Sequence, residues 1–152
     1  MIYTEQTKKA MTIMFEKHKD QIDKSGIPYV FHPWHVAESM KSEDEVVVAL
    51  LHDVVEDTDT TLQDLSNAGF NMNVIEALSL LTHDKNVDYF SYVETLSKNP
   101  IARNVKLADL KHNSDLTRLN SVSEKDILRV EKYKKCIEFL SSCNDLENSK
   151  KR

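Results

Sequence analysis

The segment that most constrains the fold is an unbroken apolar run, Val46 to Leu51, followed at once by a histidine and four carboxylates in LLHDVVEDTDT. Such a run predicts a helix that is buried on most sides, and helical periodicity then places His52 beside Glu56 and Asp53 beside Asp57. Like charges at that spacing destabilise a helix by about 0.2–0.5 kcal/mol per pair. No lysine or arginine in the segment offsets them. Either water on an exposed face or a metal ion must therefore neutralise the cluster.

The rest of the composition favours an all-α protein. Of 152 residues, only two are glycine and three are proline, while 30% are charged, which is typical of a compact helical chain. We expect a single domain over residues 1–145 and a polar C-terminal tail over residues 146–152. The sequence pattern predicts helices over residues 3–19, 33–40, 43–57, 62–68, 73–82, 87–98, 100–117 and 121–142.

Charge and hydropathy exclude several classes of function. A net charge of −5 argues against sequence-independent binding to nucleic acid. No apolar stretch reaches the length of about 18–20 residues that spans a bilayer, and the N-terminus lacks the apolar block of a signal peptide. We therefore expect a cytoplasmic protein that binds neither nucleic acid nor membranes. Cys136 and Cys143 lie too far apart along one predicted helix for a disulfide, so both should be reduced.

Four residues are candidate metal ligands: His32 at the entrance of a predicted helix, the adjacent pair His52 and Asp53, and Asp109 on a second buried helix. Taken singly, such residues are more often capping, hydrogen-bonding or solvated groups. A carboxylate within the apolar stretch VKLADL is costly, however, unless it is paired or binds a metal. Imidazole and carboxylate ligands without thiolate suit manganese, iron or magnesium, with zinc also compatible. A water on such an ion becomes a nucleophile for hydrolysis.

Three motifs, YVFHP, ALLHDVVEDT and VKLADLKHN, resemble those of the HD-domain metal-dependent phosphohydrolases. The likeness is to the hydrolase domain of RelA/SpoT-type proteins and to the small alarmone hydrolases, and it covers residues 8–140. It implies a single all-helical HD domain of about seven to nine helices around a central metal site. It also implies one manganese ion, held by the four candidate ligands, and removal of the 3′-pyrophosphate from the alarmone (p)ppGpp, giving GDP or GTP and pyrophosphate.

The resemblance also implies roles for residues outside the metal site. Glu56 and Asp57 correspond to a Glu-Asp pair that orients or activates the attacking water, which makes them the candidate catalytic residues. The residues that correspond to contacts with the nucleotide substrate are Lys24, Lys85, Asn113, Arg129 and Tyr133. Their cationic members could bind a polyphosphate despite the net negative charge of the chain.

One departure from the family pattern leaves the substrate open. The family reads His-x-Gly-Gln-x-Arg-Lys before the first metal ligand, with the arginine stacked on the base, whereas this chain reads HKDQIDK. Asp20 replaces the glycine and Asp23 replaces the arginine, and a carboxylate cannot stack as a guanidinium does. Two alternatives therefore stand beside alarmone hydrolysis. The first is hydrolysis of another nucleotide or phosphorylated metabolite, and the second is a non-catalytic nucleotide-binding module.

Overall fold

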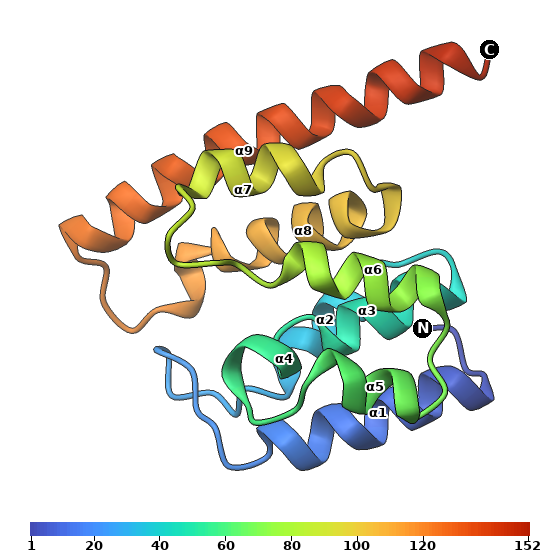
Figure 1. The fold of residues 1–152 in the computed structure, drawn as a ribbon. Coiled ribbons are helices and arrows are strands. Elements are labelled where there is room, and N and C mark those ends of the chain that lie inside the picture. The colour runs from blue at the N-terminus through green and yellow to red at the C-terminus, as the bar shows by residue number, and fades with distance from the viewer.

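The computed structural model describes residues 1–152 as nine α-helices and one short 3-10 helix, without a named strand, which confirms the prediction of an all-α fold (Figure 1). The elements are α1 Glu5–His18, α2 Phe31–Glu38, α3 Glu43–Leu51, α4 Val54–Asp57, α5 Leu62–Asn67, α6 Met72–Leu81, α7 Tyr89–Leu96, α8 Pro100–Asn113, the 3-10 helix η1 Leu116–Arg118, and α9 Glu124–Lys150.

Local sequence signals fix several helix ends where they were expected. Thr61 accepts a hydrogen bond from the amide of Asp64 and begins α5, and Ser123 with Asp126 forms a capping box at the beginning of α9. Caps of this kind typically stabilise a helix by about 1 kcal/mol. Gly69 follows α5 with a φ of +93°, a conformation that residues with a Cβ rarely adopt.

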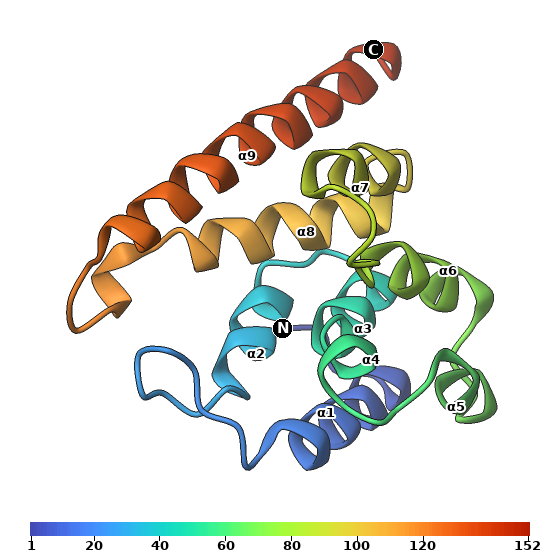
Figure 2. The same cartoon turned by 60° about the vertical axis from the view of Figure 1, so that its left-hand side comes forward.

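The centre of the fold is α3. All six residues from Val46 to Leu51 are buried, and α3 contacts α1, α2, α6 and α8. Figure 2 shows α3 and α4 between α1 on one side and α8 on the other, with α9 beyond α8. Burial of this apolar run therefore fixes the position of the polar residues directly after Leu51.

The helix predicted over residues 43–57 is interrupted. α3 ends at Leu51, His52 and Asp53 form a turn, and α4 begins at Val54. The cause is local, because His52 Nδ1 lies 2.6 Å from the carbonyl oxygen of Ala49. In a continuous helix, that carbonyl would accept the amide of Asp53. The imidazole thus takes the place of a backbone hydrogen bond.

Other boundaries also differ from the predictions. α2 begins at Phe31, so His32 lies within its first turn and not before it. α8 ends at Asn113, and residues 116–118 form η1 where the helix was expected to continue. α9 continues to Lys150 through most of the predicted polar tail, residues 146–152, and its C-terminal end projects beyond the other helices in Figure 1. The domain limit at residue 145 stays a prediction.

Two remaining expectations concern the cysteines and the membrane. Cys136 is buried, Cys143 is partly buried, and both are free thiols, as predicted. None of the helices combines the length and the apolar composition that crossing a membrane requires.

Candidate metal centre and substrate cavity

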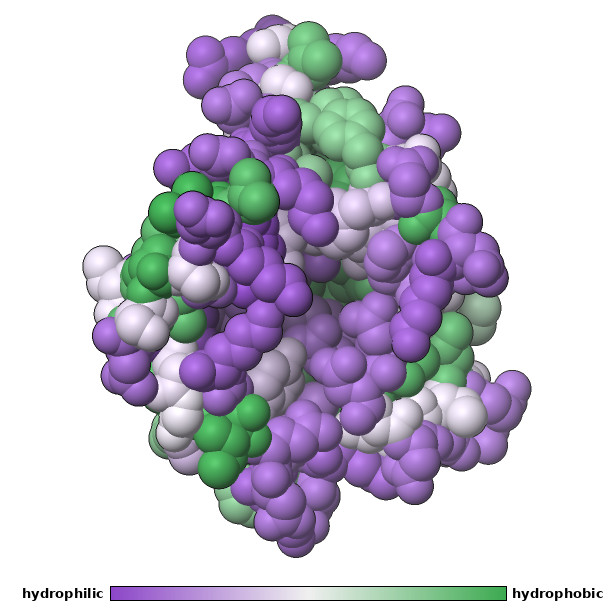
Figure 3. Space-filling view, turned by 90° about the vertical axis from the view of Figure 1, so that its left-hand side faces the viewer, coloured by the Kyte–Doolittle hydropathy of each residue, from purple (hydrophilic) through white to green (hydrophobic).

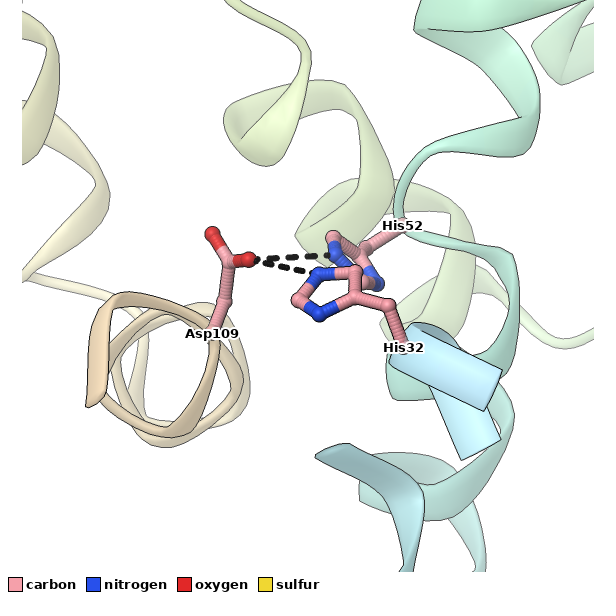
Figure 4. Close-up of side chains that lie close together, drawn as sticks. All are labelled: His32, His52 and Asp109. Carbon is pink, nitrogen blue, oxygen red and sulfur yellow. Dashed lines mark hydrogen bonds and ion pairs between the residues drawn. The ribbon is translucent and has the colours of Figure 1, made fainter. Parts of the chain in front are cut away.

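Three of the four candidate ligands converge from separate helices. His32 extends from α2, His52 from the turn after α3, and Asp109 from α8, and Figure 4 shows both imidazoles facing one carboxylate. Asp109 Oδ1 lies 2.9 Å from His32 Nε2 and 3.6 Å from His52 Nε2. All three side chains are buried, and their potential ligand atoms lie within 4.8 Å of one another.

Asp53 lies beside these three residues. Its Oδ2 atom is 3.0 Å from His52 Nε2 and 3.9 Å from His32 Nε2. The hydroxyl of Tyr29 donates a hydrogen bond to the same oxygen. The structure thus brings together all four residues that the sequence singled out as ligands, and it adds a tyrosine that orients one of them. Tyr29 lies in the motif YVFHP, but nothing in its spacing indicated this contact.

The donor set is chemically suited to a cation. Because a carbonyl oxygen only accepts, His52 Nδ1 must donate its proton to Ala49, so Nε2 is the nitrogen that faces the two carboxylates and can bind a cation. That buried Nε2 atom makes no hydrogen bond, although carboxylate oxygens lie 3.0 and 3.6 Å away. Two carboxylates that face this nitrogen in a buried site require a positive charge beside them, and without an ion Asp53 and Asp109 outweigh burial and raise the pKa of His52 well above its usual value. A divalent metal ion fits this arrangement, in which a ligand histidine uses its second nitrogen to bond the backbone.

His32 is held in a similar way on its other side. Its Nδ1 atom lies 2.7 Å from Nδ1 of His112. Burial, followed by the charges of Arg118 and His32, lowers the pKa of His112 to about 4. His112 is therefore neutral near pH 7 and can accept the proton of His32 Nδ1, so that His32 Nε2 presents its lone pair to the centre. Sequence analysis did not find this role, although His112 lies in the motif VKLADLKHN.

Both carboxylates of the centre are ionised at neutral pH. Burial alone would raise the pKa of Asp53, but His52 and the Tyr29 hydroxyl lower it to about 2. The pKa of Asp109 also lies well below its usual range, because Lys106 and the two histidines outweigh its burial. Two negative charges thus face the two imidazoles.

Lys106 is a further residue of the site that sequence analysis missed. Its Nζ atom lies 2.9 Å from Asp109 Oδ2, and its ammonium group lies 5.7 and 5.4 Å from the ring centres of Tyr89 and Tyr92. The side chain is largely buried. A lysine inside the otherwise apolar stretch VKLADL, three residues before a buried aspartate, was the available signal.

The two candidate catalytic carboxylates occupy the rim of the centre. Glu56 Oε1 accepts a hydrogen bond of 2.9 Å from the amide of His83, in the loop between α6 and α7. Asp57 is exposed, and its carboxylate makes no hydrogen bond within the chain. Desolvation by the surrounding chain, followed by the charges of Asp53 and Glu56, raises the pKa of Asp57 to about 6. A carboxylate with such a pKa can accept a proton from water near neutral pH.

A cavity of about 340 Å³ lies next to the centre. Four of the five predicted substrate contacts line it, namely Lys24, Asn113, Arg129 and Tyr133. Lys85 does not, because it lies in the loop between α6 and α7. The lining segments before α2, after α8 and at the beginning of α9 lie on the side shown in Figure 3, where hydrophilic side chains border a central hollow.

This cavity is linked to the metal centre through shared residues. Tyr29, Asn113 and Tyr133 also line a smaller cavity of about 210 Å³ that contains Asp53, Glu56 and Asp109. The Asn113 amide donates a hydrogen bond of 2.8 Å to Asp109 Oδ1. A ligand in the larger cavity can therefore extend a phosphate group toward the candidate metal ligands.

The structure also shows how the chain accommodates Asp23. Its Oδ1 atom accepts hydrogen bonds from the amides of Ser25 and Ile27, at 2.8 and 3.0 Å, and its Oδ2 atom lies 2.8 Å from Arg118 Nη2. These groups outweigh burial and lower the pKa of Asp23. Arg118 also donates to the carbonyl of His112 and lines the same cavity. The carboxylate at residue 23 is thus neutralised by a guanidinium that sequence spacing could not have revealed.

Comparisons with known proteins point to one group of enzymes. No family model matches the chain. A guanosine-3′,5′-bis(diphosphate) 3′-pyrophosphohydrolase of Aquifex aeolicus is 30% identical over 145 residues, which are 88% of this chain and 20% of that protein. The human guanosine-3′,5′-bis(diphosphate) 3′-pyrophosphohydrolase MESH1 is 38% identical over 116 residues, or 67% of this chain and 64% of that protein. The chain thus spans less than two thirds of either relative.

One solved structure has the same fold. It is described as a metazoan ortholog of SpoT that hydrolyses ppGpp and plays a role in starvation responses. The match has a TM-score of 0.75 at 24% sequence identity, and it covers 92% of this chain and 87% of the other.

Proposed function

Since the chain belongs to the HD-type RelA/SpoT hydrolases, we propose that it hydrolyses the 3′-pyrophosphate of (p)ppGpp, giving GDP or GTP and pyrophosphate. The observation that carries this proposal is the buried, unpartnered Nε2 atom of His52, which faces two ionised carboxylates beside a cavity lined by cationic side chains. That arrangement requires a cation at the point that a phosphate of the ligand can reach.

In this proposal, His32, His52, Asp53 and Asp109 hold one divalent metal ion. The nitrogen and oxygen donors, without sulfur, are compatible with manganese, iron, magnesium or zinc, and the family resemblance selects manganese among them. When bound, the ion supplies a polarised water and stabilises negative charge on the phosphate. Tyr29, Lys106 and His112 keep the ligands in position through their hydrogen bonds and ion pair.

Glu56 orients the attacking water, and Asp57 removes a proton from it. Glu56 is fixed by the amide of His83, so its second oxygen can orient the water. Asp57 has no partner within the chain and has a raised pKa, so it accepts the proton of the water. The oxygen of the water adds to the phosphorus carried by the ribose 3′ oxygen, the bond between that phosphorus and the 3′ oxygen breaks, and the 3′ oxygen takes up a proton.

The cationic cavity holds the rest of the substrate. Lys24, Arg129 and Arg118 line it and can pair with phosphate oxygens, while Asn113 and Tyr133 lie between them and the metal centre. Lys85 lies in the loop whose His83 amide bonds Glu56, so it would reach the substrate from that side.

The second candidate is hydrolysis of another nucleotide or phosphorylated metabolite, and the aspartate at residue 23 favours it. The ion pair with Arg118 weakens this argument, because it removes the charge repulsion that an isolated Asp23 would exert on a polyphosphate. A non-catalytic binding module is less consistent with the site, because Glu56 and Asp57 both stand at its rim.

The test is an activity assay on metal-stripped protein to which manganese is restored. We expect pyrophosphate and GDP to be released from ppGpp, and we expect EDTA or Asp53→Ala to abolish the release. Asp59→Ala is the matched control, because Asp59 lies in the same acidic segment but pairs with Lys17 at the surface. Folded, manganese-loaded protein that leaves ppGpp intact would refute the proposal. Turnover of another compound in a nucleotide panel would then select the second candidate.

A further inference from the structure

A second, larger cavity lies on another face of α8. It has a volume of about 830 Å³, against about 340 Å³ for the substrate cavity, and it runs between the C-terminal end of α2 and α8. None of the four candidate metal ligands lines it. Its volume falls within the range of about 300–1,000 Å³ that is typical of small-molecule sites. We refer to it as the α2–α8 groove.

The charged residues of the groove leave two ammonium groups free. Lys41 and Lys111 both line it, and neither forms an ion pair within the chain. The groove also contains two carboxylates, Glu45 and Asp115, and neither of them forms an ion pair. Glu45 accepts hydrogen bonds from the Lys41 amide and the Asn104 side chain, and Asp115 accepts them from the amide and hydroxyl of Thr117. Neutral donors thus hold the two carboxylates in place, and the two ammonium groups stay able to pair with an anionic ligand.

The other lining groups suit a flat ring. The imidazoles of His35 and His112 are stacked, with ring centres 4.1 Å apart, and both line the groove. Met40, Leu107 and Ala108 supply apolar surface beside them. Aromatic stacking together with apolar contact is how proteins commonly hold a base.

From this combination we propose that the α2–α8 groove is a second binding site, which takes a nucleotide. The phosphates pair with Lys41 and Lys111, and the base lies against the histidine pair and the apolar surface. The proposal does not depend on the reaction at the metal centre. The two places are nevertheless close, because His112, which lines the groove, also bonds the metal-ligand candidate His32 at 2.7 Å. A bound nucleotide thus contacts the residue that orients His32.

The test is a titration of the 152-residue chain with ATP and GTP in excess magnesium, followed by the amide chemical shifts of the protein. We expect the shifts to change around Ser39, Lys41 and Lys111. The double variant Lys41→Glu/Lys111→Glu should weaken this binding by about tenfold or more, because both charges are reversed. Both lysines are exposed, so the variant should keep the unfolding temperature of the wild type.

The matched control is Lys24→Glu, which reverses a charge in the substrate cavity and should leave binding in the groove unchanged. Three results would each overturn the proposal. One is a set of shift changes confined to the substrate cavity. Another is no binding of either nucleotide at millimolar concentration. The third is wild-type affinity in the double variant.

Discussion

His112 shows how a residue outside the proposed ligand set can hold one of the proposed metal ligands in position. Its Nδ1 atom lies 2.7 Å from His32 Nδ1 on one side, and its ring stacks on His35 on the other, with ring centres 5.0 Å from His32 and 4.1 Å from His35. Only the contact with His32 involves a hydrogen bond. The two neighbours therefore allow the bonding role of His112 to be separated from its stacking role.

We expect His112→Ala to weaken manganese binding by about tenfold or more, because loss of a partner to a ligand histidine typically has an effect of about 10- to 100-fold. His112→Gln keeps an acceptor and should recover part of the affinity. His35→Ala removes stacking alone and should bind manganese as the wild type does. Calorimetric titration of metal-stripped protein measures all three. Equal losses of manganese affinity in His112→Ala and His35→Ala would contradict the role of the hydrogen bond between His112 and His32.

The raised pKa of Asp57 predicts how the free energy of unfolding depends on pH. Its pKa rises from 3.8 to about 6 on folding, so the folded chain holds this proton more tightly than the unfolded chain does. Stability is therefore lost as the pH rises from about 4 to about 6, and it stays lower above that range. In metal-stripped protein, Asp57→Asn should raise the free energy of unfolding at pH 7.5 by about 1 kcal/mol, a value reduced for the exposure of the side chain, with no gain at pH 4.

Asp59→Asn is the control for this experiment. Lys17 lowers the pKa of Asp59 through a hydrogen bond and its charge, so this substitution should not stabilise the chain at pH 7.5. Denaturant unfolding at the two pH values provides the measurement. An Asp57→Asn variant that is no more stable than the wild type at pH 7.5 would show that the ionised carboxylate does not lower the free energy of unfolding.

At the scale of elements, the segment between α1 and α2 is organised by Asp23. One oxygen of its carboxylate holds two amides of the segment, and the other pairs with Arg118 in η1. This residue was the main reason to doubt a base site, since the family has arginine there. The structure gives Asp23 a different task, because it joins the segment to η1 and brings a guanidinium to the cavity wall.

Restoring arginine at residue 23 should therefore harm the protein and not improve turnover. Asp23→Arg removes the hydrogen bonds to Ser25 and Ile27 and places two guanidinium groups together, which should reduce the free energy of unfolding by about 2 kcal/mol. Adding Arg118→Asp should recover part of this loss by reversing the pair. Asp20→Arg is the control, because Asp20 is exposed and its side chain forms no hydrogen bond or ion pair. An Asp23→Arg variant with wild-type stability and faster ppGpp turnover would contradict this interpretation.

The sequence predicted those features that depend on residue type and on short spacings along the chain. The motif residues His32, His52, Asp53 and Asp109 were identifiable because residue type and position along buried helices indicate a metal site. The fold class followed from composition and periodicity. Contacts made by tertiary packing were not accessible, because Tyr29 and Asp53 are 24 residues apart and Asp23 and Arg118 are 95 residues apart. No spacing rule connects residues at such separations.

At the scale of the whole molecule, α9 joins the substrate cavity to the far end of the fold. Arg129 and Tyr133 in its first half line the cavity, while Cys136 and Leu140 are buried in the core. Its second half is fixed by Arg103 of α8, a buried guanidinium that bonds Asn144 and Glu147. This clamp, formed by Arg103, Asn144 and Glu147, explains why the helix continues into the predicted polar tail.

Two truncations test the clamp. Removing residues 143–152 deletes both partners of Arg103 on α9 and should lower the free energy of unfolding by about 2 kcal/mol, because a buried charged group loses its hydrogen bonds. Removing residues 149–152 leaves Asn144 and Glu147 in place and should have little effect. Thermal or denaturant unfolding measures both variants. Equal stability of the two truncated chains would show that Arg103 does not depend on α9.

The interruption between α3 and α4 has a consequence for protein design. Consecutive side chains on a continuous helix point about 100° apart, so two neighbours cannot both face one ion while the helix stays regular. Here His52 and Asp53 do face one point, because the chain turns between Leu51 and Val54. A designer who transplanted this centre onto a regular helical bundle would therefore have to copy the broken helix together with the four side chains.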